Sequence, residues 1–161
     1  MGSFTEAVLA FSLKSDTPEQ VIAAFRPPDL EEDYDEGEEL LYGLETGEIE
    51  DVGQLSLKDR AYIWQQLFAG MESEYFPGAP STSIRDQGSG WTVTARFHWK
   101  APASFVCQAI GPLGAFIEGD NDDPPSLVGY VKYEYDDHPL LVWHRGETRL
   151  EFEDLRLDPS D

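Results

Sequence analysis

The chain has a single cysteine, Cys107, among its 161 residues. One cysteine excludes an internal disulfide bond and any metal site built from several cysteines. It lies in an apolar stretch, FVCQA at positions 105–109, which favours a buried and unreactive thiol over a catalytic nucleophile.

Long apolar runs are also missing. No run approaches the roughly 18 residues that a membrane-spanning helix needs, and the first residues lack the basic-then-apolar form of a signal peptide. We therefore expect a cytoplasmic protein without a membrane partner. With 40% hydrophobic and 12% aromatic residues, the chain is apolar enough to fold, and its length predicts a single domain at 1–161.

Positive charge is scarce too. The chain carries 11 Lys and Arg residues against 32 Asp and Glu residues, a formal net charge of −21. Such a surface repels nucleic acids and anionic membranes and attracts basic proteins. The alternative is that the acidity only keeps the protein soluble, as in salt-adapted proteins.

Motifs for catalysis and metal binding do not occur. The three histidines, His98, His138 and His144, have no metal-ligand spacing, and neither G-x-S-x-G nor a phosphate-binding glycine loop is present. The acidic runs at 33–37 and 120–123 do not continue in the register of a calcium loop. We expect no metal, no cofactor and no catalytic residue.

Residues 90–100, GWTVTARFHWK, carry the clearest structural signal. Apolar side chains occupy every second position from Trp91 to Trp99, and polar ones occupy the positions between them. A period of two predicts a central strand with one buried face. The turn-forming run at 86–90, DQGSG, predicts a hairpin with residues 82–85.

The remaining patterns predict an α+β fold. Strands are expected at 5–13, 82–85, 90–100, 128–135, 140–144 and 148–157, and helices after Thr17, after Ser56 and over 105–117, the last kinked or split at Gly111-Pro112. Without the acidic insertion and the final hairpin extension, we interpret this order as β-α-β-β-α-β. We therefore expect a ferredoxin-like antiparallel sheet with helices on one face, an acidic insertion at 29–55 after the first helix, and an extra C-terminal strand.

Negative charge is densest at 29–51, a segment without Lys or Arg. Leu40, Leu41 and Leu44 interrupt the acidic residues, so we expect a loop or short helix that the leucines anchor and that displays its carboxylates outward. The expected partner-binding residues are Glu31, Glu32, Asp33, Tyr34, Asp35, Glu36, Glu38, Glu39 and Tyr42.

The polar face of 90–100 offers an alternative site. Arg96, His98 and Lys100 share that face, and such cationic or titratable groups can hold an anionic ligand. This hypothesis describes a small enzyme or ligand-binding domain. The competing interpretation is that these groups form cross-strand ion pairs with acids such as Glu134.

Two short motifs carry a resemblance. GWTVTAR at 90–96, and GYVKYE at 129–134 followed by Asp137-His138-Pro139, resemble a group of small, acidic actinobacterial proteins. The resemblance spans the first strand and helix and the second half of the chain, leaves out the acidic insertion, and implies no activity. In general character the chain is also similar to immunity proteins and phage-encoded inhibitors, which are small, acidic α+β proteins without catalytic motifs.

These features predict a non-catalytic acidic protein that binds and neutralises a basic protein, such as a toxin, a nuclease or a defence complex. Carboxylates spaced along the acidic segment can replace the phosphates of a nucleic acid on such a partner. Direct binding to nucleic acid is not expected, because the 11 basic residues are scattered along the chain. The sequence makes no prediction of the oligomeric state.

Overall fold

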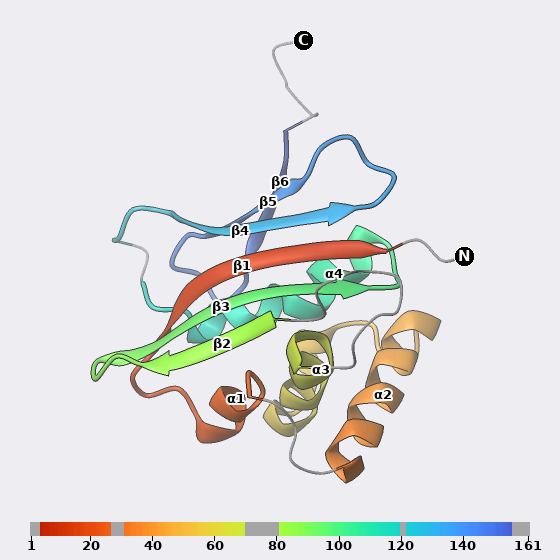
Figure 1. The fold of residues 1–161 in the computed structure, drawn as a ribbon, viewed down its shortest axis with the longest axis horizontal. Helices are drawn as coiled ribbons and strands as arrows, with labels where there is room; N and C mark the ends of the chain where they lie inside the picture. The colour runs from red at the N-terminus through yellow and green to blue at the C-terminus, as the bar shows by residue number, and fades with distance from the viewer. Residues whose placement is uncertain (1–3, 27–30, 70–80, 120–121, 156–161) are drawn as a thin grey trace.

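The computed structural model describes residues 4–26, 31–69, 81–119 and 122–155; for residues 31–38 and 69 it describes the backbone (Figure 1). It is an α+β fold built on one antiparallel sheet with the strand order β2-β3-β1-β4-β5-β6. The elements are β1 (Thr5–Lys14), α1 (Glu19–Ala23), α2 (Glu31–Thr46), the 3-10 turn η1 (Val52–Gln54), α3 (Leu57–Ala69), β2 (Ser81–Asp86), β3 (Gly90–Trp99), α4 (Ala103–Ile110), the 3-10 turn η2 (Gly111–Phe116), β4 (Ser126–Tyr133), β5 (Leu140–His144) and β6 (Glu151–Asp154).

Strand β1 lies in the interior of the sheet, where it pairs with β3 over its whole length and with β4 over its first half. Its odd-numbered residues, such as Ala7, Leu9 and Leu13, are buried because they face the helices. Its even-numbered residues Glu6, Val8 and Ala10 lie on the opposite face, which no described helix covers. We call this face the open face of the sheet.

The strand predicted at 90–100 is confirmed as β3, and the predicted hairpin with β2 is confirmed as well. Val93, Ala95 and Phe97 are buried under the helices, as the alternation requires. His98 departs from the pattern, since it lies on the open face and is nevertheless 8% exposed. Its burial comes from contacts across the strands, which periodicity alone does not encode.

A chain of edge-to-face aromatic contacts joins the helices to the sheet. The ring centroid of Phe25 lies 5.7 Å from that of Phe11 on β1 and 4.9 Å from that of Phe68 on α3. The ring of Phe68 lies 4.9 Å from Phe97 of β3. Such ring pairs stabilise a core beyond the burial of their area, so α1, α3 and the two inner strands form one packed unit.

Helix boundaries follow local chemistry, with one exception. Ser56 Oγ accepts a hydrogen bond from the backbone N–H of Asp59 at 3.2 Å, which confirms the predicted cap of α3. The predicted cap at Thr17 is wrong: Thr17 Oγ1 donates to the carbonyl of Lys14 at 2.6 Å, and the cap position is Pro18. At Gly111 the helix α4 gives way to η2, so the predicted split is confirmed.

The acidic segment is more regular than the sequence predicts. Residues 31–46 form the 16-residue helix α2, not a loop or a short helix. Leu41 and Leu44 are buried, and α2 lies against the outer side of α3 (Figure 1). The leucines therefore anchor a whole helix, which ends before Gly47, a glycine with φ of 87°.

The C-terminal part extends the sheet beyond β4. Strand β5 occupies the predicted residues 140–144, whereas β6 is shorter than predicted and runs from Glu151 to Asp154. Trp143 pairs with Glu151, and Val142 pairs with Phe152. Among the helices described, none has the length and apolarity needed to cross a membrane.

Candidate functional site

The outward face of α2 combines carboxylates with an exposed aromatic ring. Tyr42 is 68% exposed, and Glu39 and Glu45 are exposed about one turn before and after it. Leu41 and Leu44 point the opposite face of the helix into the core. We call Glu39, Tyr42 and Glu45 the α2 face.

The carboxylates of the α2 face form no ion pair with the described Lys and Arg side chains. Within the described ranges, the Lys and Arg side chains form ion pairs with Glu6, Glu19, Asp51 and Glu151. Only Asp51 belongs to the acidic segment 29–51, and Arg149 Nη1 lies 3.2 Å from its Oδ1. The described acids of α2 are therefore available to a cation from outside the molecule.

Most of the predicted partner-binding residues come before Glu39 in the sequence of α2. The backbone of Glu31, Glu32, Asp33, Tyr34, Asp35, Glu36 and Glu38 lies in the first half of α2, and their side chains lie outside the described part of the structure. Glu39 and Tyr42 are described and exposed. The structure thus places the predicted set on one helix.

A network of polar side chains occupies the middle of the open face. Glu6 on β1 accepts hydrogen bonds from Arg96 Nε (3.0 Å) and Nη2 (2.8 Å) at Oε2, and from the Tyr130 hydroxyl (2.7 Å) at Oε1. His98 Nε2 lies 3.2 Å from Oε2. One carboxylate therefore joins β1 to β3 and β4, and we call Glu6, Arg96, His98 and Tyr130 the Glu6 network.

The environment of the network shifts three pKa values. Burial alone raises the pKa of Glu6, but hydrogen bonds from Tyr130 and Arg96 outweigh it and hold that pKa below its ordinary value. Burial lowers the pKa of His98 in spite of the nearby Glu6 carboxylate, so its imidazole is neutral at pH 7. The hydrogen bond to Glu6 raises the pKa of Tyr130, which keeps the phenol protonated.

The structure changes the membership of the alternative site. Arg96 and His98 come together as predicted, but Lys100 lies beyond the end of β3 and does not line the same cavity. Their acidic partner is Glu6 and not Glu134, whose Oε1 accepts a hydrogen bond from the backbone of Phe4 at 3.2 Å. Glu6, Tyr130 and Lys132 were missed, because only the pairing register of β1 with β4 brings them beside Arg96.

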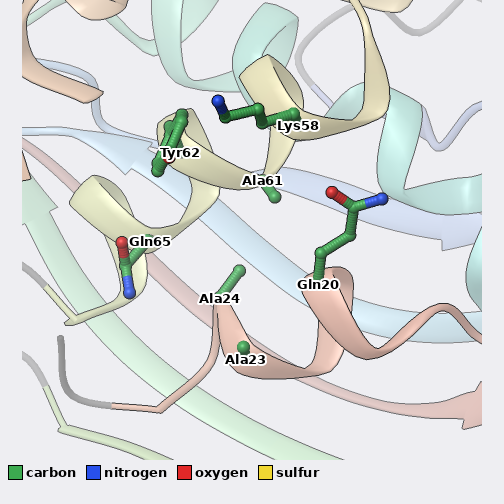
Figure 2. A pocket seen from close by; sticks show the side chains of 7 residues that line it. All are labelled: Gln20, Ala23, Ala24, Lys58, Ala61, Tyr62 and Gln65. Carbon is green, nitrogen blue, oxygen red and sulfur yellow. The ribbon is translucent and has the colours of Figure 1, made fainter. Parts of the chain in front are cut away.

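The described residues line at least three cavities, two on the open face of the sheet and one between helices. One of about 220 Å³ is lined by Phe4, Glu6, Arg96, His98, Lys132 and Glu134. A second, of about 490 Å³, continues over the open face along β1. The third, of about 300 Å³, lies between α1 and α3, where Figure 2 shows Ala24 facing Ala61, with Gln20, Lys58 and Tyr62 around them.

The cysteine and the two other histidines are not arranged for catalysis or metal binding in the described part of the chain. Burial raises the pKa of the Cys107 thiol to about 12, so the thiolate needed for nucleophilic chemistry does not form at neutral pH. His144 is buried with Nε2 3.1 Å from the carbonyl of Gly114, and His138 is exposed in a turn. In the part of the chain that the structure describes, no three His, Cys, Asp or Glu residues are grouped to hold a metal ion.

Comparison with other proteins gives no relative. No family model, curated protein or solved structure matches the chain. Function is therefore inferred from the surfaces that the chain itself presents, the α2 face and the open face of the sheet.

Proposed function

We propose that this protein is a non-catalytic binding protein that neutralises a basic protein partner through the outward face of α2. The observation that carries the proposal is the exposure of Tyr42 between Glu39 and Glu45, on a helix whose described carboxylates have no ion pair with the protein's own Lys and Arg side chains. An exposed tyrosine flanked by unpaired charge is suited to a protein interface, where aromatic anchors supply much of the affinity.

Charge and the aromatic ring have different roles in this proposal. A surface of one sign raises the association rate with an oppositely charged partner by about 10 to 10³-fold at low ionic strength. Tyr42 then supplies contact area that is removed from water in the complex. Helical spacing places positions 31, 35 and 38 on the same side of the α2 backbone as position 42.

The partner is a basic toxin, nuclease or defence complex, in the manner of immunity proteins or phage anti-defence inhibitors. A nucleic-acid-binding partner fits best, because carboxylates along a helix can replace phosphates on its basic surface. In that case DNA competes with this protein for the partner. The proposed location is the cytoplasm, where such partners act.

The fold is proposed to be a ferredoxin-like core with additions. The first four strands follow the order β2-β3-β1-β4, and β5 and β6 extend the sheet beyond it. In this interpretation α2 is the acidic insertion, since it packs on α3, whereas α3 itself packs on β2 and β3. An added helix at the periphery suits a binding function, because its outward residues can change without repacking the sheet.

The test compares charge reversal at two places on the molecule. Immobilised protein is used to capture partners from the native host or its target cell at low and high salt, with Glu39→Lys/Glu45→Lys and Tyr42→Ala as variants. We expect each variant to lose a partner that wild type retains at low salt and releases at high salt. The matched controls are Glu118→Lys/Glu147→Lys and Tyr135→Ala, exposed acids and an exposed tyrosine elsewhere on the surface.

The controls decide what the charge does. If the control reversal weakens capture as much as the α2 reversal does, net charge and not the α2 face determines binding. If capture withstands high salt and both α2 variants, the proposed function is wrong.

A further inference from the structure

A groove follows β1 across the open face of the sheet. Its volume is about 490 Å³, its base contains Val8 and Ala10, and its sides contain Thr94 on β3 and Tyr130 on β4. Arg96 lines both this groove and the polar cavity around Glu6, so the two hollows adjoin at that residue. The open face therefore has a polar end, at the cavity around Glu6, and a mostly apolar groove that adjoins it along β1.

The pairing register arranges the groove in rows. Glu6 stands between His98 and Lys132, and the next row toward the C-terminal end of β1 contains Arg96, Val8 and Tyr130. Thr94 and Ala10 form the row after that. From Glu6 in the polar cavity to Ala10 in the groove, β1 spans about 14 Å, at roughly 3.4 Å per residue.

Hydrogen-bond donors remain unused at the polar end. Both carboxylates there already accept hydrogen bonds, Glu6 from Arg96 and Tyr130, and Glu134 from the backbone N–H of Phe4. Arg96 uses Nε and Nη2 on Glu6, which leaves the Nη1 edge without a protein acceptor in the described ranges. Lys132, half-buried beside the cavity, has no ion pair there either.

We propose that this groove binds an aliphatic monocarboxylate of medium chain length. Its carboxylate accepts hydrogen bonds from Lys132 and the Nη1 edge of Arg96, and its alkyl chain lies over Val8 and Ala10 against Tyr130. A single negative charge is required, because Glu6 stays ionised between the two cations and repels a phosphate dianion. The apolar length selects a chain over a small anion, since each buried methylene adds to the affinity.

The test titrates the whole protein with octanoate, followed by calorimetry and by backbone amide chemical shifts. Butyrate has the same carboxylate with less chain, 1-octanol has the chain without charge, and inorganic phosphate has charge without a chain. We expect saturable octanoate binding with shifts in β1, β3 and β4, and affinity for butyrate lower by at least about 10-fold. Phosphate and 1-octanol are expected to bind more weakly than octanoate.

Two variants locate the site. Lys132→Gln is expected to weaken octanoate binding by about 10-fold, through loss of a charge-assisted hydrogen bond. Ala10→Glu places a carboxylate in the base of the groove at an exposed position and is expected to abolish binding. Lys58→Gln, at an exposed lysine on α3, and the α2 charge reversal are the controls, and both are expected to bind octanoate as wild type does.

The outcomes separate this site from the α2 face. Absence of saturable octanoate binding, equal binding of 1-octanol, shifts confined to the cavity between α1 and α3, or unchanged affinity in Lys132→Gln would each overturn the proposal. None of these results bears on capture of a basic protein by α2.

Discussion

At the scale of single residues, Glu6 differs from the other described carboxylates. Hydrogen bonds from two neighbouring strands hold it, and its side chain is 25% exposed. A carboxylate that is buried and bonded in this way links strands, whereas an exposed one only adds charge to the surface. Within a strongly acidic chain, Glu6 is thus part of the sheet's structure.

The Glu6 network predicts a loss of stability on acidification. The pKa of His98 is below its ordinary 6.5 in the folded protein, so the unfolded chain binds more protons once the pH falls below 6.5. The pKa of Glu6 is below its ordinary 4.5, so its contribution is present above 4.5 and is lost as the pH falls through the folded value. As the pH falls, we expect the free energy of unfolding in urea to decrease first below pH 6.5, through His98, and again below pH 4.5, through Glu6.

Replacement of His98 isolates the upper window. In His98→Gln the side chain still donates to Glu6 but does not titrate, so the decrease just below pH 6.5 should be smaller than in wild type. His138→Gln removes an exposed histidine from a turn and should leave the profile unchanged. Identical pH profiles for His98→Gln and wild type would show that His98 is not linked to folding.

Gly129 is predicted to be irreplaceable in β4. A Cβ atom at this position would lie against the carbonyl oxygen of Val8 and 2.9 Å from the Cα of Leu9, both in the paired strand β1. These backbone atoms cannot move without breaking the pairing, so Gly129→Ala should lower the free energy of unfolding by at least about 3 kcal/mol.

The matched control is Gly47→Ala at the end of α2. Gly47 has φ of 87° and no neighbouring atom within 4 Å of an added Cβ. Its replacement should therefore lower the free energy of unfolding by only about 1 kcal/mol, the cost of holding alanine at a positive φ. If both variants lose the same stability in urea denaturation, contact with β1 is not what constrains Gly129.

At the scale of elements, α2 shows why the acidic segment looks irregular in sequence. Its glycines and like charges at i, i+4 disfavour an isolated helix, and its last turn has no basic residue to interact with the helix dipole. The helix forms because Leu41 and Leu44 pack against the rest of the fold. Tertiary contact overrides local propensity in this element.

The contact between α3 and α4 gives a prediction at the same scale. Trp64 is fully buried, and its Nε1 donates to the carbonyl of Ala109 at 2.9 Å. Trp64→Phe removes this donor and leaves a smaller ring, so thermal and urea unfolding should show a loss of about 2 kcal/mol.

Trp143 provides the control for Trp64. Its Nε1 is buried and has no hydrogen-bond partner among the described residues, so Trp143→Phe removes an unsatisfied donor and not a bond. The loss should be clearly smaller than for Trp64→Phe, while the stacking of Arg145 over the ring is retained in part. Equal losses would mean that ring volume, and not the bond to Ala109, accounts for the effect.

At the scale of the whole molecule, a net charge of −21 predicts opposite effects of salt on folding and binding. Raising the salt from about 0.01 M to about 0.15 M shortens the Debye length from roughly 30 Å to roughly 8 Å. Self-repulsion then weakens, so the Tm in a thermal melt should rise, while capture of a basic partner should weaken. A Tm that falls over this range would show that the acids are balanced in the folded state.

The local pattern of the chain determined much of the fold. Alternation at 90–99, the Ser56 cap and the break at Gly111 depend on neighbours a few residues apart, and the structure has all of them. The length of α2 was underestimated and the cap at Thr17 was misplaced, because packing against α3 and the turn after β1 decide them.

The candidate sites divide in the same way. The sequence by itself determined the charge and the identity of the acidic segment, since composition does not depend on folding. The tertiary structure alone decided that Glu6 bonds Arg96 and Tyr130, that Lys132 and not Lys100 lines the cavity beside them, and that a groove lies along β1. Strand register sets these contacts, and register comes from the burial of one whole face against the helices.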